Sequence, residues 1–371
     1  MNIYKLILIY QFLSYIQSQI IPLNYSLSVN DFAVIVLISE PHEYKHFYID
    51  MVTNFTWASF SYYNRLNSAT VSKLGTNTVP FGSREIDFEI LQDELFFPQH
   101  IKNFTFYYSM QYLGCFDTLS FSHTFLDQRT SFTYNLYSQH LIEYNRFGID
   151  ADTFENGMLF LGDLPGNASS NVRNVFNVPK NKVTWNVDIS TLIIKGKEYE
   201  NKEDNFEAIF QFRERRILIP KKVQQFINEQ IFNRYKENKI CAYNSGYGYN
   251  FYTCDCKIEE DIKSIIFIMN DKEVEISMKN LLRKMKYDDC QFLIEENIMN
   301  ENQWVLGMPF FNEYKAIFDY ETDTVTLFSK NKFKNHFTYN KTPLSLIIIN
   351  NVINLSGIFL LLYINVFNKF I

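Results

Sequence analysis

The stretch from Trp304 to Phe328 constrains the fold of this 371-residue chain more than any other part of its sequence. It reads WVLGMPFFNEYKAIFDYETDTVTLF, in which an apolar run ends at Gly307 and a short aromatic-rich segment follows. Two later runs, 314–320 and 324–328, are enriched in β-branched and aromatic residues, and the polar residues 321–323 join them. This pattern predicts a strand, a tight turn and a second strand.

Length and composition set the broad class of the protein. A chain of 371 residues is long for a single hydrophobic core, so two domains are expected. Apolar residues make up 47% of the chain and aromatic residues 17%, which excludes disorder, and the 25 Tyr and 36 Phe favour β structure. The net charge is −6 with dispersed basic residues, so no nucleic-acid partner is predicted.

The N-terminus has the pattern of a secretory signal peptide, predicted over residues 1–19. Lys5 precedes an apolar core at residues 6–16, and Ser18 supplies a small residue near a cleavage point. The alternative is a buried N-terminal helix. It is less favoured because a polar segment with a glycan acceptor, Asn24-Tyr25-Ser26, follows directly.

Glycan acceptor patterns of the form Asn-X-Ser/Thr recur along the chain. In an Asn-rich sequence some of them arise by chance, but several together fit an exported protein. The predicted sites are Asn24, Asn54, Asn103, Asn167 and Asn340.

A second hydrophobic block, residues 344–367, follows Pro343 close to the C-terminus. It is long enough to cross a bilayer, but Asn350, Asn351 and Asn354 inside it are costly for a permanent span. A glycolipid-anchor signal therefore competes with a transmembrane span, and it is favoured because no basic cluster follows. The lack of a clear small-residue attachment site counts against the anchor. Either reading predicts an exported domain tethered to a membrane.

The hairpin region carries a family resemblance. The phrase W-[IV]-L-G-x-x-F…Y…V/I-F-D of the pepsin-like (A1) aspartic peptidases is matched, in order, by Trp304, Leu306, Gly307, Phe311, Tyr314, Phe318 and Asp319. The chain resembles this family from about residue 32 to residue 328. The resemblance implies an all-β, two-lobed fold with a cleft between an N-terminal lobe, 28–178, and a C-terminal lobe, 179–333.

The family's first catalytic aspartate is matched at Asp50. From Ile38 onward the sequence fits the family's I-G-T-P-P-Q-x-F-x-V-x-F-D-T-G-S-S-x-L-W without a gap. The Thr and Gly of Asp-Thr-Gly, however, have become Met51 and Val52. Met51 has no hydroxyl group to tie the two catalytic loops together, and a β-branched valine resists the tight turn that glycine permits.

The second catalytic position falls on Gln211. Trp185 to Lys197 resembles the opening of the family's second lobe, and residues 208–216 stand where the family has A-I-[VF]-D-T-G-T-S. Pro220 and a predicted helix over 223–232 fix the register from the other side. The resemblance therefore places Gln211 at the second aspartate, with no Thr-Gly after it.

The flap that covers the substrate in this family is matched only weakly. Residues 81–95 resemble the flap hairpin, but Phe81 replaces its tyrosine and Gly82 is one of few matches. Arg84 and Glu85 stand where small residues would let a peptide approach. An ordinary exposed hairpin with a charged tip is the favoured interpretation.

Four of the five cysteines fall in the predicted C-terminal lobe, and Cys115 lies alone in the first and is predicted to be a buried free thiol. In an exported chain disulfides are expected. The family has a bridge in this region, which implies the pair Cys256–Cys290, with Cys241–Cys254 as the second. No histidine lies near these cysteines, so neither a metal site nor a cofactor is predicted.

Two functional hypotheses follow. One is an exported, membrane-tethered and catalytically inactive homologue, a monomer that binds a peptide or protein ligand in the inter-lobe cleft. The other is a working acid endopeptidase with an atypical dyad. Gln211 favours the first. The expected location is the secretory pathway, at the extracellular face of the plasma membrane or in an endolysosomal lumen.

Overall fold

Alternating burial shows why most of the chain forms strands. In β19 (Lys272–Ser277), the apolar side chains of Val274 and Ile276 are buried while their charged neighbours are exposed. This is the period of two expected for a strand with one face on a core. Asn270 and Asp271, both with positive φ, form the two-residue turn that joins β19 to β18 (Ser264–Met269), as primed hairpin turns require.

The computed structural model describes residues 19–26, 31–38, 43–59, 63, 65–81, 84–96, 100–110, 117–151, 156–162, 172–200, 206–246, 249–285, 288–300 and 302–330. Residues 1–329 form one compact unit and residues 330–371 a second, of which only Lys330 is described.

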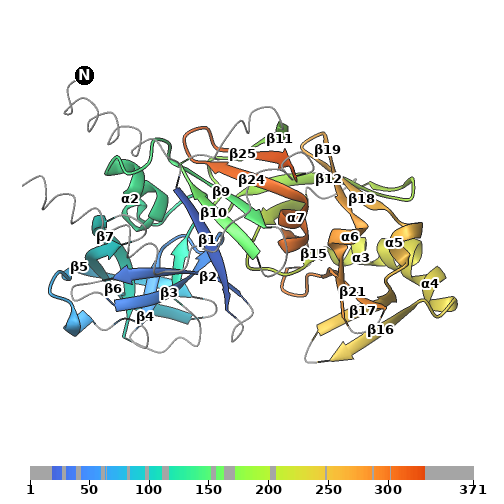
Figure 1. The fold of residues 1–371 in the computed structure, drawn as a ribbon, viewed down its shortest axis with the longest axis horizontal. Helices are drawn as coiled ribbons and strands as arrows, with labels where there is room; N and C mark the ends of the chain where they lie inside the picture. Colours follow the sequence, from blue (N-terminus) through green and yellow to red (C-terminus); the bar gives the residue numbers. More distant parts are fainter. Residues whose placement is uncertain are drawn as a thin grey trace, which may run out of the picture. The chain divides into compact units, whose positions relative to one another are not determined.

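The largest sheet joins the start, the middle and the end of the described chain. Its order is β11 (Val172–Asn177), β25 (Thr324–Ser329), β24 (Tyr314–Asp319), β9 (Arg146–Ala151), β10 (Asn156–Leu161), β1 (Gln19–Ser26), β2 (Asp31–Ile38), β3 (Glu43–Asp50), β8 (Thr118–Ser120), β4 (Trp57–Ser59), β7 (His100–Ser109), β6 (Arg84–Phe96) and β5 (Ser72–Phe81). The hairpin predicted near the C-terminus is confirmed as β24–β25, and it lies between β9 and β11 (Figure 1).

Two further sheets are built from residues after 185. The first has the order β19, β18, β12 (Asn186–Ile194), β14 (Phe206–Phe210), β23 (Trp304–Leu306), β15 (Ile217–Ile219) and β22 (Ile294–Glu296), with β13 (Lys197–Glu200) paired to β12. The second has the order β16 (Cys241–Gly246), β17 (Tyr249–Asp255), β21 (Asp289–Phe292) and β20 (Leu282–Lys284).

Helices are short. They are η1 (Arg65–Asn67), η2 (Gln128–Thr130), α2 (Phe132–Ser138), α3 (Lys221–Ile227), the π-helical η4 (Asn228–Phe232), α4 (Asn233–Glu237), α5 (Ile258–Asp261), α6 (Met278–Leu281) and α7 (Met308–Glu313). The helix predicted over 223–232 is confirmed, although it is interrupted by the π-helical turn. None of the described helices is long and apolar enough to cross a bilayer.

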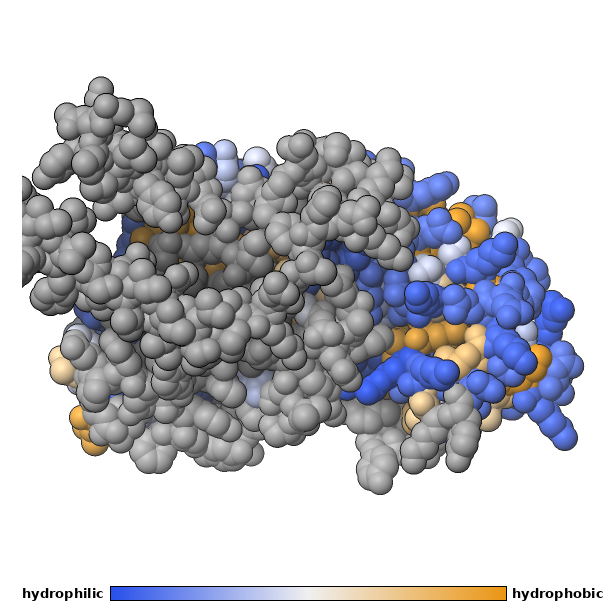
Figure 2. Space-filling view, in the orientation of Figure 1, coloured by the Kyte–Doolittle hydropathy of each residue, from blue (hydrophilic) through white to orange (hydrophobic). Residues whose placement is uncertain are grey.

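An aromatic core joins the sheets. Trp185 is fully buried, and its ring lies 6.1 Å from that of Phe147 in β9 and 5.3 Å from that of Phe318 in β24. Its indole N–H donates to the carbonyl oxygen of Phe121 at 2.9 Å. Burial of three large rings at one point stabilises the junction between the two halves of the sequence. On the face shown in Figure 2, the coloured surface is mostly hydrophilic, with small hydrophobic patches.

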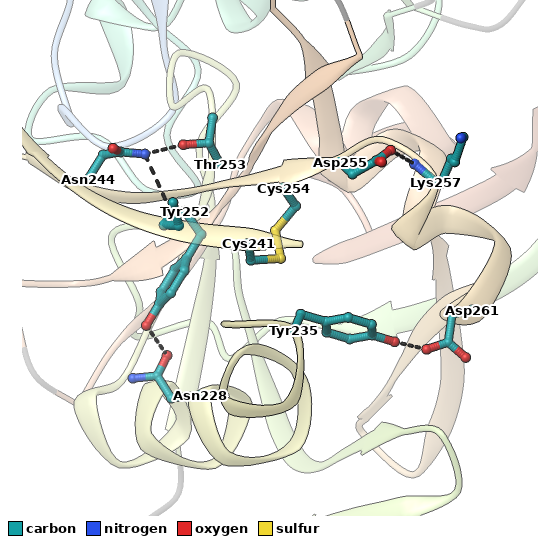
Figure 3. The surroundings of a disulfide bond; sticks show 11 residues. Asn228, Tyr235, Cys241, Asn244, Tyr252, Thr253, Cys254, Asp255, Lys257 and Asp261 are labelled. Atoms are coloured by element: carbon teal, nitrogen blue, oxygen red, sulfur yellow. Dashed lines mark hydrogen bonds between the residues drawn. A yellow bond between two sulfur atoms is a disulfide. The ribbon is translucent and has the colours of Figure 1, made fainter. Parts of the chain in front are cut away.

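Both disulfides are attached to the four-stranded sheet, and Cys256 directly follows the end of β17. Cys241 and Cys254 face each other on β16 and β17 and are bonded (Figure 3). Cys256 is bonded to Cys290 on β21. These are the two pairs that the family resemblance implies. Figure 3 also shows Tyr235 donating from its hydroxyl to Asp261 close to the first bridge.

The flap region differs from the prediction. The stretch 81–95 is not a hairpin by itself, because Arg84–Phe96 is one continuous strand, β6. The hairpin is instead formed by β5 and β6, and Phe81 ends β5 opposite Arg84. The charge-rich run 85–90 alternates polar and apolar residues, which suits a strand better than a turn.

Several predicted features lie outside the described residues. They are the signal segment up to residue 18, the hydrophobic block 344–367, Gly82, Cys115, Asn167 and Asn340. Gln19, placed at the end of the predicted signal peptide, is the first residue of β1.

Candidate functional site

Asp50 is the last residue of β3, and its carboxylate is held by the residues that follow it. Asp50 Oδ1 accepts hydrogen bonds from the backbone N–H of Val52 at 2.8 Å and of Thr53 at 3.2 Å. Asp50 Oδ2 accepts one from the Thr53 hydroxyl at 2.6 Å. The residue is 7% exposed, so these donors replace much of the water that would otherwise solvate the charge.

The loop after Asp50 is held by hydrogen bonds from the segment 120–126. The backbone N–H of Phe121 donates to the Asp50 carbonyl at 2.7 Å, and that of Leu126 donates to the Asn54 carbonyl at 3.0 Å. The Ser120 hydroxyl donates to the Thr53 carbonyl. The parallel pairing of β3 with β8 places this segment beside Asp50.

Gln211 stands opposite Asp50. It follows β14 directly, and its backbone N–H donates to the Leu306 carbonyl of the neighbouring β23 at 3.1 Å. The Gln211 side-chain Nε2 lies 3.4 Å from Asp50 Oδ1, across a sequence separation of 161 residues. Because an ionised carboxylate only accepts hydrogen bonds, the amide must be the donor. Gln211 Oε1 is buried and has no hydrogen-bond partner among the described residues.

The two positions after Asp50 and the two after Gln211 are occupied by apolar or charged residues, not by the threonine and glycine of the family motif. Met51 and Phe212 are both fully buried in one hydrophobic core. Val52 is 36% exposed, and the guanidinium of Arg213 lies 5.6 Å from the ring centroid of Tyr48, on the strand that leads to Asp50. Apolar packing and a cation–π contact therefore occur here, where hydroxyl groups would otherwise join the two loops.

The loop after Gln211 is shaped by a network of charged groups. Arg216 Nε donates to Glu214 Oε1 at 2.8 Å, and Arg216 Nη1 donates to Glu295 Oε2 at 2.6 Å. Glu295 lies on β22 and is 6% exposed. The carbonyl of Glu214 accepts the backbone N–H of Met308 at 2.7 Å, which ties the loop to the start of α7.

Burial and ion pairing shift the pKa values of Glu295 and Arg216. Burial raises the pKa of the Glu295 carboxyl, and the nearby Arg216 guanidinium opposes this only in part. Burial would lower the pKa of Arg216, but its contacts with Glu214 and Glu295 outweigh it and the net pKa is raised. Arg216 therefore remains charged and anchors two carboxylates at the edge of the site.

The other predicted site residues are not part of this constellation. Phe81 ends β5, and only its backbone is described. Of the predicted glycan acceptors, Asn54 is half-buried, Asn103 is exposed, and Asn24 pairs through its backbone in β1. In the part of the chain that the structure describes, no three His, Cys, Asp or Glu side chains converge as metal ligands would.

Sequence reasoning missed three contributors to the site. Thr53 stands at the serine of the family's D-T-G-S phrase, so its position alone could have indicated the hydroxyl that bonds Asp50. Ser120 and the pair Arg216–Glu295 have no such signal, because their contacts join segments 67 and 79 residues apart.

Two β-rich halves that bring the ends of equivalent strands together at Asp50 and Gln211 define the pepsin-like class of fold. The chain belongs to the eukaryotic aspartyl protease family, whose model matches residues 55–330. The matched region begins after Asp50 and includes Gln211.

The fold comparison agrees with this assignment. The structure is similar to the crystal structure of an aspartic proteinase from Irpex lacteus, with a TM-score of 0.63 over 84% of this chain and 97% of that chain. At 13% sequence identity this likeness shows the fold alone. The predicted all-β, two-lobed architecture is thereby confirmed. No curated protein matches the sequence.

Proposed function

We propose that this protein is a catalytically inactive member of the aspartyl protease family that binds a peptide or protein segment between its lobes. The observation that carries the proposal is the contact of the Gln211 amide with the Asp50 carboxylate at 3.4 Å. In a working enzyme of this type, two carboxylates share one proton.

The chemistry of peptide hydrolysis requires both acids. One carboxylate removes a proton from the attacking water while the other protonates the carbonyl oxygen of the scissile bond. The Gln211 amide can donate a hydrogen bond, but it neither takes up nor releases a proton at an accessible pH. The loss of one acid–base partner costs on the order of 10²–10⁴ in rate.

Binding does not need the second acid. The two loops are held by contacts that do not depend on a catalytic dyad: the Thr53 and backbone donors on Asp50, the packing of Met51 and Phe212, and the Arg216 network. A preformed site with fixed polar groups can therefore bind a ligand without reacting with it. The ligand class is an extended peptide or protein segment, bound by a monomer without a cofactor.

Export and membrane tethering form the second part of the proposal. Two disulfides support an oxidising compartment. The signal-like N-terminus, the Asn-X-Ser/Thr patterns and the hydrophobic block 344–367 support delivery to the cell surface or an endolysosomal lumen. Release of the protein from membranes by a phosphatidylinositol-specific phospholipase would distinguish a glycolipid anchor from a transmembrane span. Recovery of a wholly soluble protein without this treatment would refute both.

An acid endopeptidase with an atypical dyad is the alternative, and the intact hydrogen bonding of Asp50 favours it. Purified full-length protein incubated with denatured haemoglobin between pH 3 and 6 decides between the two functions. We expect no cleavage, and no tight binding of pepstatin. Pepstatin-sensitive cleavage that disappears in Asp50→Asn would establish the peptidase and overturn the proposal.

A further inference from the structure

His123 occupies a buried junction between three distant parts of the chain. Its side chain is 1% exposed and lies against Trp185, with ring centroids 4.6 Å apart. The backbone N–H groups of His123 and Thr124 both donate to the Val183 carbonyl, at 2.9 and 3.1 Å. Residue 183 belongs to the connection between β11 and β12, so the junction joins the segment after β8 to the crossover between the lobes.

Both ring nitrogens of His123 face oxygen atoms that can only accept. Nδ1 lies 3.0 Å from the backbone carbonyl oxygen of Lys182, and Nε2 lies 3.0 Å from Asp323 Oδ1. A neutral imidazole has one N–H, so it would leave the other nitrogen's lone pair facing an oxygen lone pair in a buried position. The imidazolium has two N–H groups and satisfies both contacts.

The surroundings supply further reasons for a positive charge on the ring. Asp323, in the turn between β24 and β25, carries the charge opposite to it. The Trp185 ring beside it attracts a cation. Two lysines approach the same junction: one shares the Asp323 carboxylate with His123, through its other oxygen, and one is directed to a different carboxylate. Lys180 Nζ lies 3.3 Å from Asp323 Oδ2, and Lys182 Nζ is paired with Glu207 on β14.

We propose that His123 is an acid-strengthened latch between the lobes. When the ring is protonated, it ties the segment after β8 to the crossover and to the last hairpin. When it is neutral, one of these two hydrogen bonds is lost and the junction loosens. The latch is distinct from the proposed ligand binding, and it would operate in either functional class.

The latch acts on the segment that holds Asp50. Two residues before His123, the Phe121 amide donates to the Asp50 carbonyl at 2.7 Å. Three residues after it, the Leu126 amide donates to the Asn54 carbonyl at 3.0 Å. Loosening at His123 would therefore reach both ends of the Asp50 loop. The site is expected to be more rigid at pH 5 than at pH 8.

The test compares thermal unfolding of the full-length protein with that of His123→Gln between pH 5 and pH 8. Gln can donate one hydrogen bond but carries no charge at either pH. We expect the wild-type midpoint to exceed that of the variant by about 3–6 °C at pH 5, and the gap to shrink by at least half at pH 8. His140→Asn is the control, since His140 is exposed and its positive φ suits Asn.

A second variant and a local probe keep the test decisive if His123→Gln does not fold. Asp323→Asn removes the opposite charge at a residue with φ 51°, where Asn is tolerated. It should lose the pH dependence that the wild type and the His140→Asn control share. In the wild type, exchange of the Phe121 and Leu126 amides, corrected for intrinsic rates, should be about tenfold faster at pH 8 than at pH 5. The latch would be refuted if the difference in unfolding midpoint between wild type and His123→Gln did not depend on pH and amide exchange were unchanged. A difference that widens as pH rises would refute it as well.

Discussion

Gly307 passes so close to Glu214 that a β-carbon on the glycine would lie 2.3 Å from the Glu214 carbonyl oxygen. It would lie 2.1 Å from the carbonyl of Arg216 as well. Both are backbone atoms of the loop that follows Gln211, so no side-chain rotation can relieve the overlap. The close approach lets the strand that ends at Leu306 support Gln211 directly, through the 3.1 Å bond between them.

Gly307→Ala is therefore expected to be severely destabilising. Because the backbone itself would have to shift, the free energy of unfolding should fall by at least about 3 kcal/mol. Chemical denaturation of the purified protein measures the loss. Gly75→Ala is the matched control, since its β-carbon would meet nothing within 4 Å, and it should change stability by less than about 0.5 kcal/mol. Equal effects of the two substitutions would contradict the packing argument.

Arg216→Met tests the charged network behind the site. The substitution leaves Glu295 buried without its partner, which typically costs about 3–5 kcal/mol. The double variant with Glu295→Gln should recover part of this loss, because the uncompensated carboxylate is then gone. The coupling is read from a double-mutant cycle of unfolding free energies. If the effects of the two single substitutions on the unfolding free energy simply added in the double variant, the 2.6 Å contact would contribute no coupling energy.

The pH dependence of stability should report on Glu295. Burial raises the pKa of its carboxyl in the folded protein, so between the ordinary pKa of 4.5 and the raised pKa the folded state binds more protons than the unfolded chain. Stability contributed by this group therefore falls as pH rises through that window. Glu295→Gln should flatten this part of the pH profile, measured by denaturation from pH 4 to pH 7. An unchanged slope would exclude Glu295 as its source.

The two disulfides should differ in their contribution to stability. The Cys256–Cys290 bridge closes a loop of 34 residues and the Cys241–Cys254 bridge one of 13. In the chain-entropy model each contributes roughly 3–4 kcal/mol, the longer loop by about 1 kcal/mol more. Paired Cys→Ser variants, compared by denaturation, should follow that order. A larger loss from removing the short-range bridge would point to native-state contacts rather than loop entropy.

The sequence allows some features to be predicted because they are local. The last hairpin was predictable from two β-patterned runs around a polar turn. Gln211 was predictable from the resemblance of residues 208–216 to a family motif, with the Pro-led helix fixing the register. The Arg216–Glu295 pair and the contacts of His123 were not predictable, because they join residues brought together only by sheet pairing. The flap hairpin was misplaced for a related reason: its position is set by the pairing of β5 with β6, in which Phe81 lies opposite Arg84.

Gln211→Glu is the most direct test of the pair at the centre of the site. The new side chain has the length of the old one, so its carboxylate would stand where the amide now lies 3.4 Å from Asp50 Oδ1. Two like charges at that distance raise the pKa of the pair. The variant should lose on the order of 1–3 kcal/mol of stability at pH 7. The loss should shrink as pH falls, when the folded pair takes up a proton, and vanish below about pH 4, when the unfolded carboxyls are protonated as well.

Gln211→Met is the control for this substitution, because it removes the hydrogen bond without adding a charge and its effect should not vary with pH. Neither Gln211→Glu nor the shorter Gln211→Asp should cleave denatured haemoglobin between pH 3 and 6. Met51 and Phe212 still replace the hydroxyl groups that join the loops in active members, and Arg213 still lies against Tyr48. Pepstatin-sensitive cleavage by either acidic variant would show that one carboxylate was all the site lacked.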